Sequence, residues 1–298
     1  MCGLLLSVAS GCESTGAEGL RLEAIAFPDE TPILSAWRIR SADPDFGGIS
    51  GAALAPGGRE ITLVSDRGHA FRLLLRRDAG EALKGAELVG KSALSGIEGP
   101  LSRRRDRDAE ELAAYRGGHL VAFEHFHRLR WHRDGLDRPP VSVPLPKQAV
   151  TLPENSGIEA MTVLADGRIV LIAEEVGPDG ATSWIGDGQG AWRASTYVPA
   201  PSYRPTGAAA LPDGSIVVLE RHFTLFGGFA ALLARAWPNP DGVWRREELM
   251  RLPGPALGEN FEAVTVWRDR TGRMRALLAS DDNFSLLQST LFVEVALP

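Results

Sequence analysis

Cysteine and lysine are both scarce in this chain of 298 residues. The two cysteines, Cys2 and Cys12, lie near the N-terminus, so the rest of the chain can hold no internal disulfide. Lysine occurs only at positions 84, 91 and 147, and arginine supplies the rest of the 32 basic residues. With 38 acidic residues the formal net charge is −6, and no basic stripe is present. Nucleic acid is therefore not an expected partner.

Several catalytic signatures are also missing. The chain contains no Gly-x-Ser-x-Gly elbow, no phosphate-binding loop and no dinucleotide fingerprint. These absences argue against a serine hydrolase and against an enzyme with a nucleotide cofactor, and we expect no organic cofactor. No stretch after the first twelve residues is long and apolar enough to span a bilayer.

A motif recurs along the chain, and its clearest copy, SGIEAMTVLADGRIVLIAEE, spans residues 156–175. Copies aligned on Ile49, Ala109, Ile158, Thr206 and Phe261 follow one another at offsets of 60, 49, 48 and 55 residues. This spacing suits one four-stranded propeller blade per repeat. We therefore predict an all-β fold, a β-propeller with five or six four-stranded blades around a central channel.

Each copy predicts a β-hairpin. Apolar runs at 158–164 and 168–174 flank the turn Ala165-Asp166-Gly167, where glycine accepts a positive φ at little cost. Pairing residues symmetrically about these turns places Ile158 opposite Glu174 and Ile49 opposite Asp66. The same rule pairs Ala109 with Glu124, Thr206 with Glu220, and Phe261 with Asp281. If all blades share one orientation, these hairpin ends converge on one mouth of the channel.

The strand ends that meet at this mouth are unusually polar. First strands begin with Glu110, Glu159, Thr206 and Glu262, with Asn155 and Asn260 nearby. Second strands end with Asp66, Arg67, Glu124, His125, Glu174, Glu175, Glu220, Arg221, Asp281, Asp282 and Asn283. Folding requires apolar strand interiors but not charged ends, so this ring is the candidate site. The structural alternative is that the acids pair with Arg67, Arg204 and Arg221 and merely cap the channel.

Crowded carboxylates need cations, protons or arginines nearby, and oxygen ligands suit Ca²⁺ or Mg²⁺ better than zinc. We expect Ca²⁺ ligands among Glu110, Glu124, Glu159, Glu174, Glu220, Glu262, Asp281 and Asp282. The expected catalytic residues are Glu159, Glu262, Asp66 and His69. The expected substrate-binding residues are Arg67, Arg204, Arg221 and Asn283.

Two further clusters favour packing over chemistry. His125, His127 and His132 in EHFHRLRWH lack a regularly spaced third ligand or a cysteine, so a surface or packing role is preferred to metal binding. His69 lies nearer the mouth and is the better acid/base candidate, because the unperturbed pKa of histidine is close to neutral. The second cluster, Phe223, Phe226 and Phe229, predicts packing of outer strands, with a lip that contacts an apolar substrate as the alternative.

Residues 1–12, MCGLLLSVASGC, resemble the end of a bacterial lipoprotein signal with Cys12 at the lipidated position. We expect residues 1–19 to be an export signal and polar spacer, and residues 20–298 a single domain, periplasmic or lipid-anchored to the cell envelope and monomeric. The segment 20–27 is expected to pair with the last blade, near 290–297. The segments 33–40 and 96–99 leave room for a sixth blade.

The ordered series FGGISGAAL…LVSDRG, DAEELA…FEHFHRL, SGIEAMTVLADGRIVLIAEE, YRPTGAAALPDGSIVVLERHF and NFEAVTV…ASDDNFS…STLFVEVAL resembles the bacterial phytase-like domain family, often named for an esterase-like activity of phytase. The resemblance runs from about Trp37 to Leu297 and implies an exported propeller linked to phosphoester hydrolysis. Alkaline β-propeller phytases use a surface rich in Lys and Arg with several Ca²⁺ ions. Here arginine would have to supply the phosphate contacts, so a smaller phosphoester is favoured over phytate.

The first functional hypothesis is a metal-assisted hydrolase acting on a small-molecule phosphoester or other ester at the acidic mouth. The second is a non-catalytic propeller that binds a ligand or partner protein through the same mouth. The third is a Ca²⁺-dependent lactonase, because the segment GIEGP, which contains Glu98, loosely resembles a segment of propeller lactonases.

Overall fold

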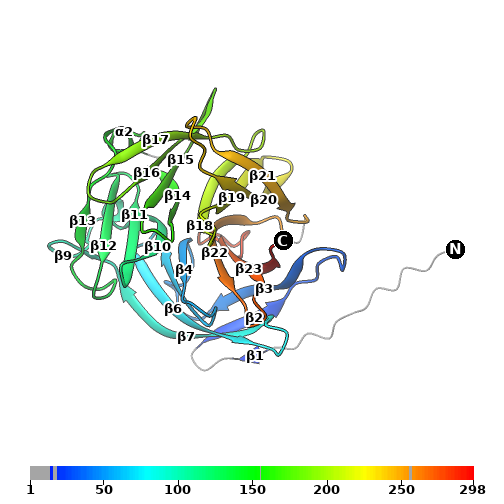
Figure 1. Cartoon of the computed structure of the whole chain (residues 1–298). Coiled ribbons are helices and arrows are strands. Elements are labelled where there is room, and N and C mark those ends of the chain that lie inside the picture. The colour runs from blue at the N-terminus through cyan, green and yellow to red at the C-terminus, as the bar shows by residue number, and fades with distance from the viewer. Residues whose placement is uncertain (1–13, 16–18, 155, 255–256) are drawn as a thin grey trace.

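The computed structural model describes residues 14–15, 19–154, 156–254 and 257–298. Strand makes up 57% of it and helix 3%, and five four-stranded antiparallel blades form a ring (Figure 1). The predicted β-propeller is therefore confirmed, with five blades. The expectations placed on Cys12 and Asn155 fall outside the described residues.

Four blades are each built from strands that are consecutive in sequence. Blade one contains β4 (Ile49–Leu54), β5 (Glu60–Ser65), β6 (His69–Arg77) and β7 (Leu83–Ala93). Blade two contains β10 (Ala109–Tyr115), β11 (Gly118–Phe123), β12 (Arg128–His132) and β13 (Val141–Val143). Blade three contains β14 (Ile158–Val163), β15 (Ile169–Gly177), β16 (Gly180–Gly186) and β17 (Trp192–Tyr197). Blade four contains β18 (Arg204–Ala210), β19 (Ile216–Thr224), β20 (Gly228–Trp237) and β21 (Arg245–Arg251).

Blade five combines strands from both ends of the sequence. β22 (Asn260–Arg268), β23 (Met274–Asp281) and β24 (Thr290–Ala296) are followed by β3 (Ile33–Ser41), and β2 (Leu20–Ala24) and β1 (Ser14–Thr15) extend the sheet outward. The N-terminal part thus completes the last blade, but β3, not the segment 20–27, is the strand that pairs with β24. Residues 33–40 therefore do not begin a sixth blade. The segment 96–99 lies in a small two-stranded sheet of β8 (Ser95–Gly96) and β9 (Gly99–Pro100).

Two short helices, α1 (Arg104–Arg107) and α2 (Lys147–Val150), lie in connections between blades. None of the helices within the described ranges is long and apolar enough to cross a membrane.

The hydrophobic core is divided among the blade junctions. Each of the five largest clusters of buried apolar side chains joins two neighbouring blades. The innermost strands β4, β10, β14, β18 and β22 contact one another around the centre (Figure 1). Their small residues permit this approach: a Cβ added to Gly51 would lie 2.5 Å from the backbone nitrogen of Leu112, and one added to Gly207 would lie 2.7 Å from the carbonyl oxygen of Glu262.

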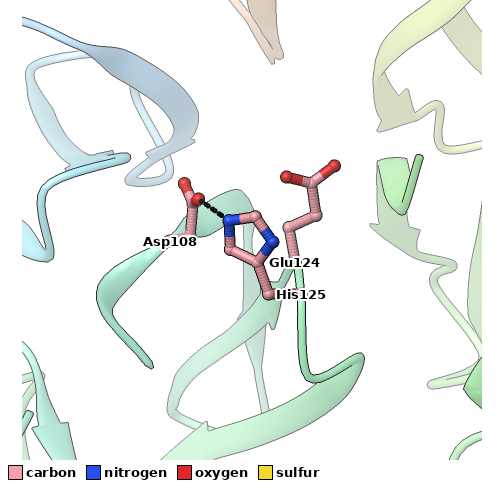
Figure 2. A group of neighbouring side chains, drawn as sticks. All are labelled: Asp108, Glu124 and His125. Carbon is pink, nitrogen blue, oxygen red and sulfur yellow. Dashed lines mark ion pairs between the residues drawn. The ribbon is translucent and has the colours of Figure 1, made fainter. Parts of the chain in front are cut away.

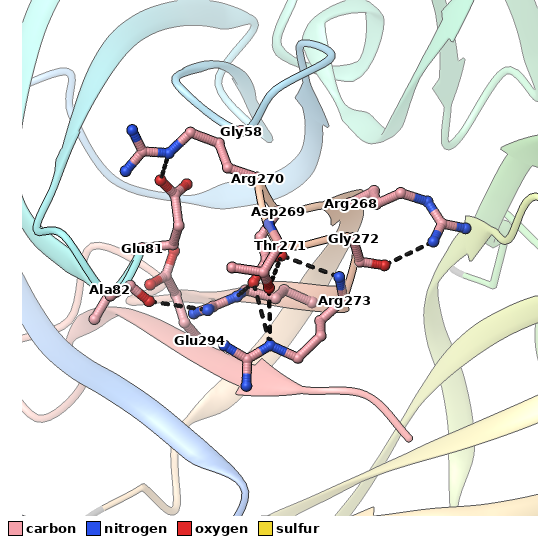
Figure 3. A network of polar contacts seen from close by, with 12 residues as sticks. Gly58, Glu81, Ala82, Arg268, Asp269, Arg270, Thr271, Gly272, Arg273 and Glu294 are labelled. Atoms are coloured by element: carbon pink, nitrogen blue, oxygen red, sulfur yellow. Dashed lines mark hydrogen bonds and ion pairs between the residues drawn. The ribbon is translucent and has the colours of Figure 1, made fainter.

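A dense polar network joins blade one to blade five (Figure 3). The fully buried Glu294 of β24 forms an ion pair with Arg77 of β6 and accepts hydrogen bonds from the backbone N–H of Leu83 at 2.8 Å and from the hydroxyl of Ser35 at 3.1 Å. Nearby, Asp269 accepts a hydrogen bond from Nε of Arg275 at 2.7 Å. Each of these buried acids is thus matched by an arginine and by further donors. We call this group the closure network.

The two faces of the ring differ in their connections. The first strand of each blade starts at the acidic mouth, so antiparallel pairing brings the loops between second and third strands, and the connections between blades, to that same side. We call it the mouth face. The opposite face carries the turns between first and second and between third and fourth strands, which are short and polar, such as 165–167 and 212–214.

Candidate functional site

A β-bulge recurs at the start of the innermost strand of every blade. The pairing of first and second strands skips one residue in each case, between Ile49 and Gly51 in blade one and between Ile158 and Ala160 in blade three. The skipped residues are Ser50, Glu110, Glu159, Thr206 and Glu262. A bulge redirects one side chain without ending the strand, so the five blades present five redirected polar residues.

This bulge also shifts the strand register that the sequence predicts. Ile158 lies opposite Ala173, not Glu174, and Phe261 lies opposite Ser280, not Asp281. Likewise Ile49 pairs with Ser65, Ala109 with Phe123, and Glu220 with Pro205. The predicted cross-strand pairs are therefore wrong by one residue throughout, because symmetric pairing does not allow for an inserted residue.

The residues that follow these pairs form a second set at the mouth. They are Asp66, Glu124, Glu174, Arg221 and Asp281, one from each blade. Their backbone positions match: the N–H of Asp66, Glu124 and Glu174 donates to a carbonyl oxygen at the start of the first strand at 3.0, 3.0 and 3.1 Å respectively. Together the two sets place seven carboxylates and one guanidinium at the mouth.

The two bulge residues without charge connect neighbouring blades. The hydroxyl of Ser50 donates to the carbonyl oxygen of Ala109, and the hydroxyl of Thr206 donates to the carbonyl oxygen of Phe261 at 3.0 Å. In these two blades the redirected side chain is used for folding. The other three bulge residues are glutamates, whose ionised carboxylates accept hydrogen bonds and cannot donate to a backbone carbonyl, so they cannot join blades in this way.

Arg221 is the central cation of the site. Its guanidinium donates to Asn260 and Glu262 and lies 3.4 Å from Glu174, while Asn260 donates to Glu262 at 2.8 Å. Burial alone would lower the pKa of Arg221, but Glu262, Glu159 and Glu174 together raise it. Arg204, whose side chain is 55% exposed, lies 3.7 Å from Glu174 at the edge of the same group.

Glu110, Glu124 and Glu159 form the part of the site to which Arg221 donates no hydrogen bond among the described residues, although its charge partly offsets that of Glu159. One carboxylate oxygen from each lies within 4.8 Å of those of the other two. Burial, followed by repulsion from neighbouring acids, raises the pKa of Glu110 and Glu159 well above the ordinary range and raises the pKa of Glu124 to about 7. Glu159 is only 7% exposed, and no hydrogen bond or ion pair engages its side chain within the described ranges. We call these three glutamates the acidic triad.

A second group shares Glu124 with the acidic triad (Figure 2). Nε2 of His125 lies 2.9 Å from a carboxylate oxygen of Asp108, and Nδ1 of His125 is buried without a hydrogen-bond partner in the described part of the chain. His125 has a positive φ of 56°, which is uncommon outside glycine and turns its ring back toward Asp108. The sequence alone favours a packing role for His125, yet it is the histidine that joins the site.

The acidic triad fits a hard divalent cation. Its three donors are all oxygens, they come from two blades, and their mutual repulsion is not relieved by a hydrogen-bond donor to Glu159 among the described residues. Ca²⁺ and Mg²⁺ prefer such donors, whereas zinc prefers nitrogen and sulfur. A cation would remove the free-energy cost of burying these charges, which otherwise only protons can remove.

Asp66, Asp281 and Asp282 lie where blades one and five meet. Burial and repulsion raise the pKa of Asp66 to about 6, and its Oδ1 is buried without a hydrogen-bond partner among the described residues. The pKa of Asp281 is raised by burial and by Glu262. Asp282 instead holds the loop together, since it accepts hydrogen bonds from the N–H groups of Gly48 and Phe284 at 3.0 Å each. These hydrogen bonds give Asp282 a structural role in the loop, in place of the metal-ligand role that the sequence predicts.

Arg67 and Asn283 flank this loop. The guanidinium carbon of Arg67 lies 3.2 Å from the centroid of the Phe284 ring, and no ion pair engages this guanidinium within the described chain. The side-chain amide of Asn283 donates to Gln288 at 2.9 Å. Arg67 therefore has donors to offer a ligand, and Asn283 supports the loop.

Glu220 and His69 lie apart from the cluster. Glu220 is fully buried between blades, where it binds Arg246, the hydroxyl of Tyr197 and the backbone N–H of Ala200. Side chains alternate along a strand, so the one-residue shift that puts Arg221 at the mouth directs Glu220 into the core. His69 lies 3.8 Å from Asp45 on the outer side of blade one. Burial lowers the pKa of His69.

Glu111 is a functional candidate that sequence reasoning missed. It is 1% exposed, and its carboxylate accepts a hydrogen bond from the N–H of Leu112 at 2.9 Å and one from the N–H of Ala208, across the channel, at 3.4 Å. Burial raises its pKa well above the ordinary range. The other blades have Gly or Ala at this position, so the signal was present in the aligned repeats.

The repeated bulge and the mouth residues fall within a region shared with known proteins. The family described as the esterase-like activity of phytase, or phytase-like, matches residues 44–284. The chain belongs to this family. A search of curated proteins found no match. The phytase-like match includes both sets of mouth residues and the acidic triad.

Solved structures similar to this phytase-like chain match it at low identity. A PQQ-bound aldose sugar dehydrogenase from Streptomyces coelicolor is 12% identical, with a TM-score of 0.46 over 88% of this chain and 98% of that one. A gluconolactonase from Xanthomonas campestris is 11% identical, with a TM-score of 0.46 over 94% and 87%. A thermostable family-43 glycoside hydrolase is 10% identical, with a TM-score of 0.49 over 84% and 89%.

Proposed function

We propose that this phytase-like protein is a hydrolase that acts on a phosphoester or other ester. It requires a divalent cation held at the acidic mouth, and Ca²⁺ is the preferred candidate. The observation that carries the proposal is the acidic triad: three buried or half-buried carboxylates within 4.8 Å, one of them without a partner among the described residues. The second support is membership of a family described by esterase-like activity.

Each group at the mouth has a role in this proposal. Glu110, Glu124 and Glu159 hold the cation, which supplies polarisation of the ester and activation of water. Arg204 and Arg67 have exposed donors for the anionic group of the substrate. Arg221 is already engaged by Glu262 and Asn260, so it fixes the geometry of the mouth and limits its negative charge.

His125 is the proposed acid/base residue. Asp108 accepts a hydrogen bond from Nε2–H, which leaves Nδ1 unprotonated in the neutral imidazole. That nitrogen is then available to take a proton from water, as a base held in one tautomer by a carboxylate does. His69 interacts with Asp45 instead, and the proposal gives it no part in proton transfer.

The test combines metal binding with turnover. Full-length protein carrying Cys12→Ser is assayed by calorimetry with Ca²⁺ and against p-nitrophenyl phosphate, p-nitrophenyl acetate and gluconolactone, with and without chelator. Glu159→Gln should weaken Ca²⁺ binding and lower kcat by about 100-fold. His125→Gln should lower kcat by about 100-fold while Ca²⁺ binding persists. Asp166→Asn, in a turn of the opposite face, is the matched control and should change neither.

The possible outcomes separate the three hypotheses. Hydrolysis that is unaffected by chelator would contradict the metal-assisted mechanism. A protein that binds Ca²⁺ but is inert toward every ester would favour the non-catalytic alternative, a propeller that binds a ligand through its mouth. Turnover of gluconolactone alone would favour the lactonase, although Glu98 lies exposed in a connection between blades.

A further inference from the structure

Exposed apolar side chains are concentrated on one face of the ring. Of thirteen large apolar side chains that are exposed in the described ranges, four lie elsewhere: Leu74, Ile97, Val141 and Val243. The other nine lie on the mouth face: Phe126, Val150, Val176, Val198, Phe223, Leu225, Phe226, Leu286 and Leu287. Scattered exposure would need no explanation, but this segregation does.

The most exposed of these residues occupy the tips of two loops on neighbouring blades. Leu225 and Phe226 are 82% and 100% exposed at the tip of the β19–β20 hairpin. Leu286 and Leu287 are 105% and 94% exposed in the loop between β23 and β24. We call these two tips the apolar tips.

The hairpin that carries the first tip is well ordered by its own contacts. β19 and β20 remain paired as far as Thr224 and Gly228, and the Phe223 and Phe229 rings pack with centroids 4.7 Å apart. The N–H of Gly227 donates to the hydroxyl of Thr224 at 2.9 Å. The predicted packing of Phe223, Phe226 and Phe229 is thus confirmed for Phe223 and Phe229 and wrong for Phe226, which is fully exposed at the tip.

The second loop is braced in a comparable way. Asp282 binds Phe284 and also accepts a hydrogen bond from the hydroxyl of Thr290 at 3.1 Å. The N–H of Ser285 donates to the carbonyl oxygen of Asp282 at 2.8 Å, and Leu287 N–H donates to the hydroxyl of Ser285 at 3.2 Å. In both loops, hydrogen bonds therefore fix the backbone in a conformation that leaves the leucine and phenylalanine side chains of the apolar tips exposed to solvent.

We propose that the mouth face docks onto a lipid bilayer, with the apolar tips inserted among the acyl chains and the acidic mouth facing the headgroups. The apolar residues stand at separate loop tips and not in one flat patch. A protein partner would need a matching pocket for each tip, whereas a bilayer accepts them at any spacing. Exposed Arg103 and Arg104, in a connection on the same face, suit lipid phosphates.

This inference concerns where the protein acts and does not depend on the proposed hydrolase activity. It also gives that activity a substrate class, since a phosphoester or ester within a lipid headgroup would lie directly at the mouth. The lipid anchor expected at Cys12 would act in addition, and it is removed from the test below so that the loops are measured alone.

The test is co-sedimentation of full-length Cys12→Ser protein with vesicles of phosphatidylethanolamine and phosphatidylglycerol. Two double variants, Leu225→Ser/Phe226→Ser and Leu286→Ser/Leu287→Ser, should each weaken partitioning by about 30-fold, because each removes two inserted side chains. The matched control Val141→Ser/Val243→Ser removes exposed apolar residues away from the mouth face and should bind as the parent does. All variants should keep the thermal midpoint of the parent, since the replaced residues are exposed.

Binding should persist in high salt, because burial of apolar side chains drives it. A parent protein that stays in the supernatant would overturn the proposal, as would double variants that sediment like the control. Binding lost in salt but unchanged in the double variants would assign the attraction to the arginines and equally contradict insertion. Concentration-dependent dimerisation abolished by the same double variants, without vesicle binding, would overturn it too and assign the tips to a second copy of the chain.

Discussion

The closure network and the acidic mouth both bury carboxylates, but they treat them in opposite ways. At the closure network, Glu294 has Arg77, Leu83 and Ser35 as partners. At the mouth, Glu159 is nearly as buried and has no such partner in the described chain. Burial opposes ionisation at both places, yet hydrogen bonds from Thr271 and Arg275 hold the pKa of Asp269 below its ordinary range while the pKa of Glu159 is raised. A chain that can satisfy buried acids in one place leaves them unsatisfied in another, which points to a ligand.

The largest expected effect would come from the closure network. Glu294→Gln leaves the guanidinium of Arg77 buried without a counter-charge and should lower the free energy of unfolding by about 3–5 kcal/mol. Chemical denaturation would measure it. Adding Arg77→Met to Glu294→Gln should recover part of the loss. In chelator, Glu159→Gln should not lower the free energy of unfolding. A larger loss for Glu159→Gln than for Glu294→Gln would show that Glu159, and not Glu294, is the acid that the fold stabilises.

An intermediate effect is expected from pH at the mouth. Because the pKa of Glu124 is raised to about 7 and that of Asp66 to about 6, the folded state binds more protons than the unfolded state above the ordinary carboxyl pKa. The stabilisation is complete below that pKa and is lost as pH rises toward 7. In chelator the free energy of unfolding should therefore fall by roughly 2 kcal/mol between about pH 4.5 and 7.5.

Calcium and one variant sharpen this pH prediction. Saturating Ca²⁺ should reduce the fall in stability, because the cation binds the deprotonated acids. Glu124→Gln should reduce the fall in chelator, and thermal midpoints across the pH range would measure both. Stability that rises over the same interval in chelator would show that the mouth acids are already neutralised by the chain.

The smallest effect is expected at the opposite face. Asp166 lies 2.7 Å from Arg168 in an exposed turn, where water screens the pair. Asp166→Asn should change the free energy of unfolding by about 0.5 kcal/mol or less. Chemical denaturation of this variant and of Glu294→Gln would compare the free energy of unfolding lost at an exposed and at a buried ion pair. Equal losses in the two variants would show that burial does not strengthen the effect.

The sequence predicted the propeller and the location of the mouth, but it left the blade number at five or six and predicted the wrong strand beside β24. Repeat spacing and turn chemistry predicted the hairpins, and the polar strand ends predicted which channel mouth collects the acids. The bulge could not be predicted by symmetric pairing, since an inserted residue leaves the turn and the apolar run unchanged. As a result Glu220, which lies one residue from Arg221, was expected at the mouth although it faces the core.

Two other residues have roles that depend on distant neighbours and not on their local sequence. His125 is one of three histidines in a single segment, and only the fold brings Asp108 to its ring. Glu111 lies beside Glu110, but its carboxylate reaches blade four. Contacts across the channel join residues almost a hundred positions apart, and no local pattern encodes them.

The pairing of β3 with β24 has a consequence for the order of events during synthesis. Strand β3 must wait, with one edge unpaired, until β24 leaves the ribosome. The ring consequently stays open until β24 has been synthesised, and it can close only when β24 pairs with β3.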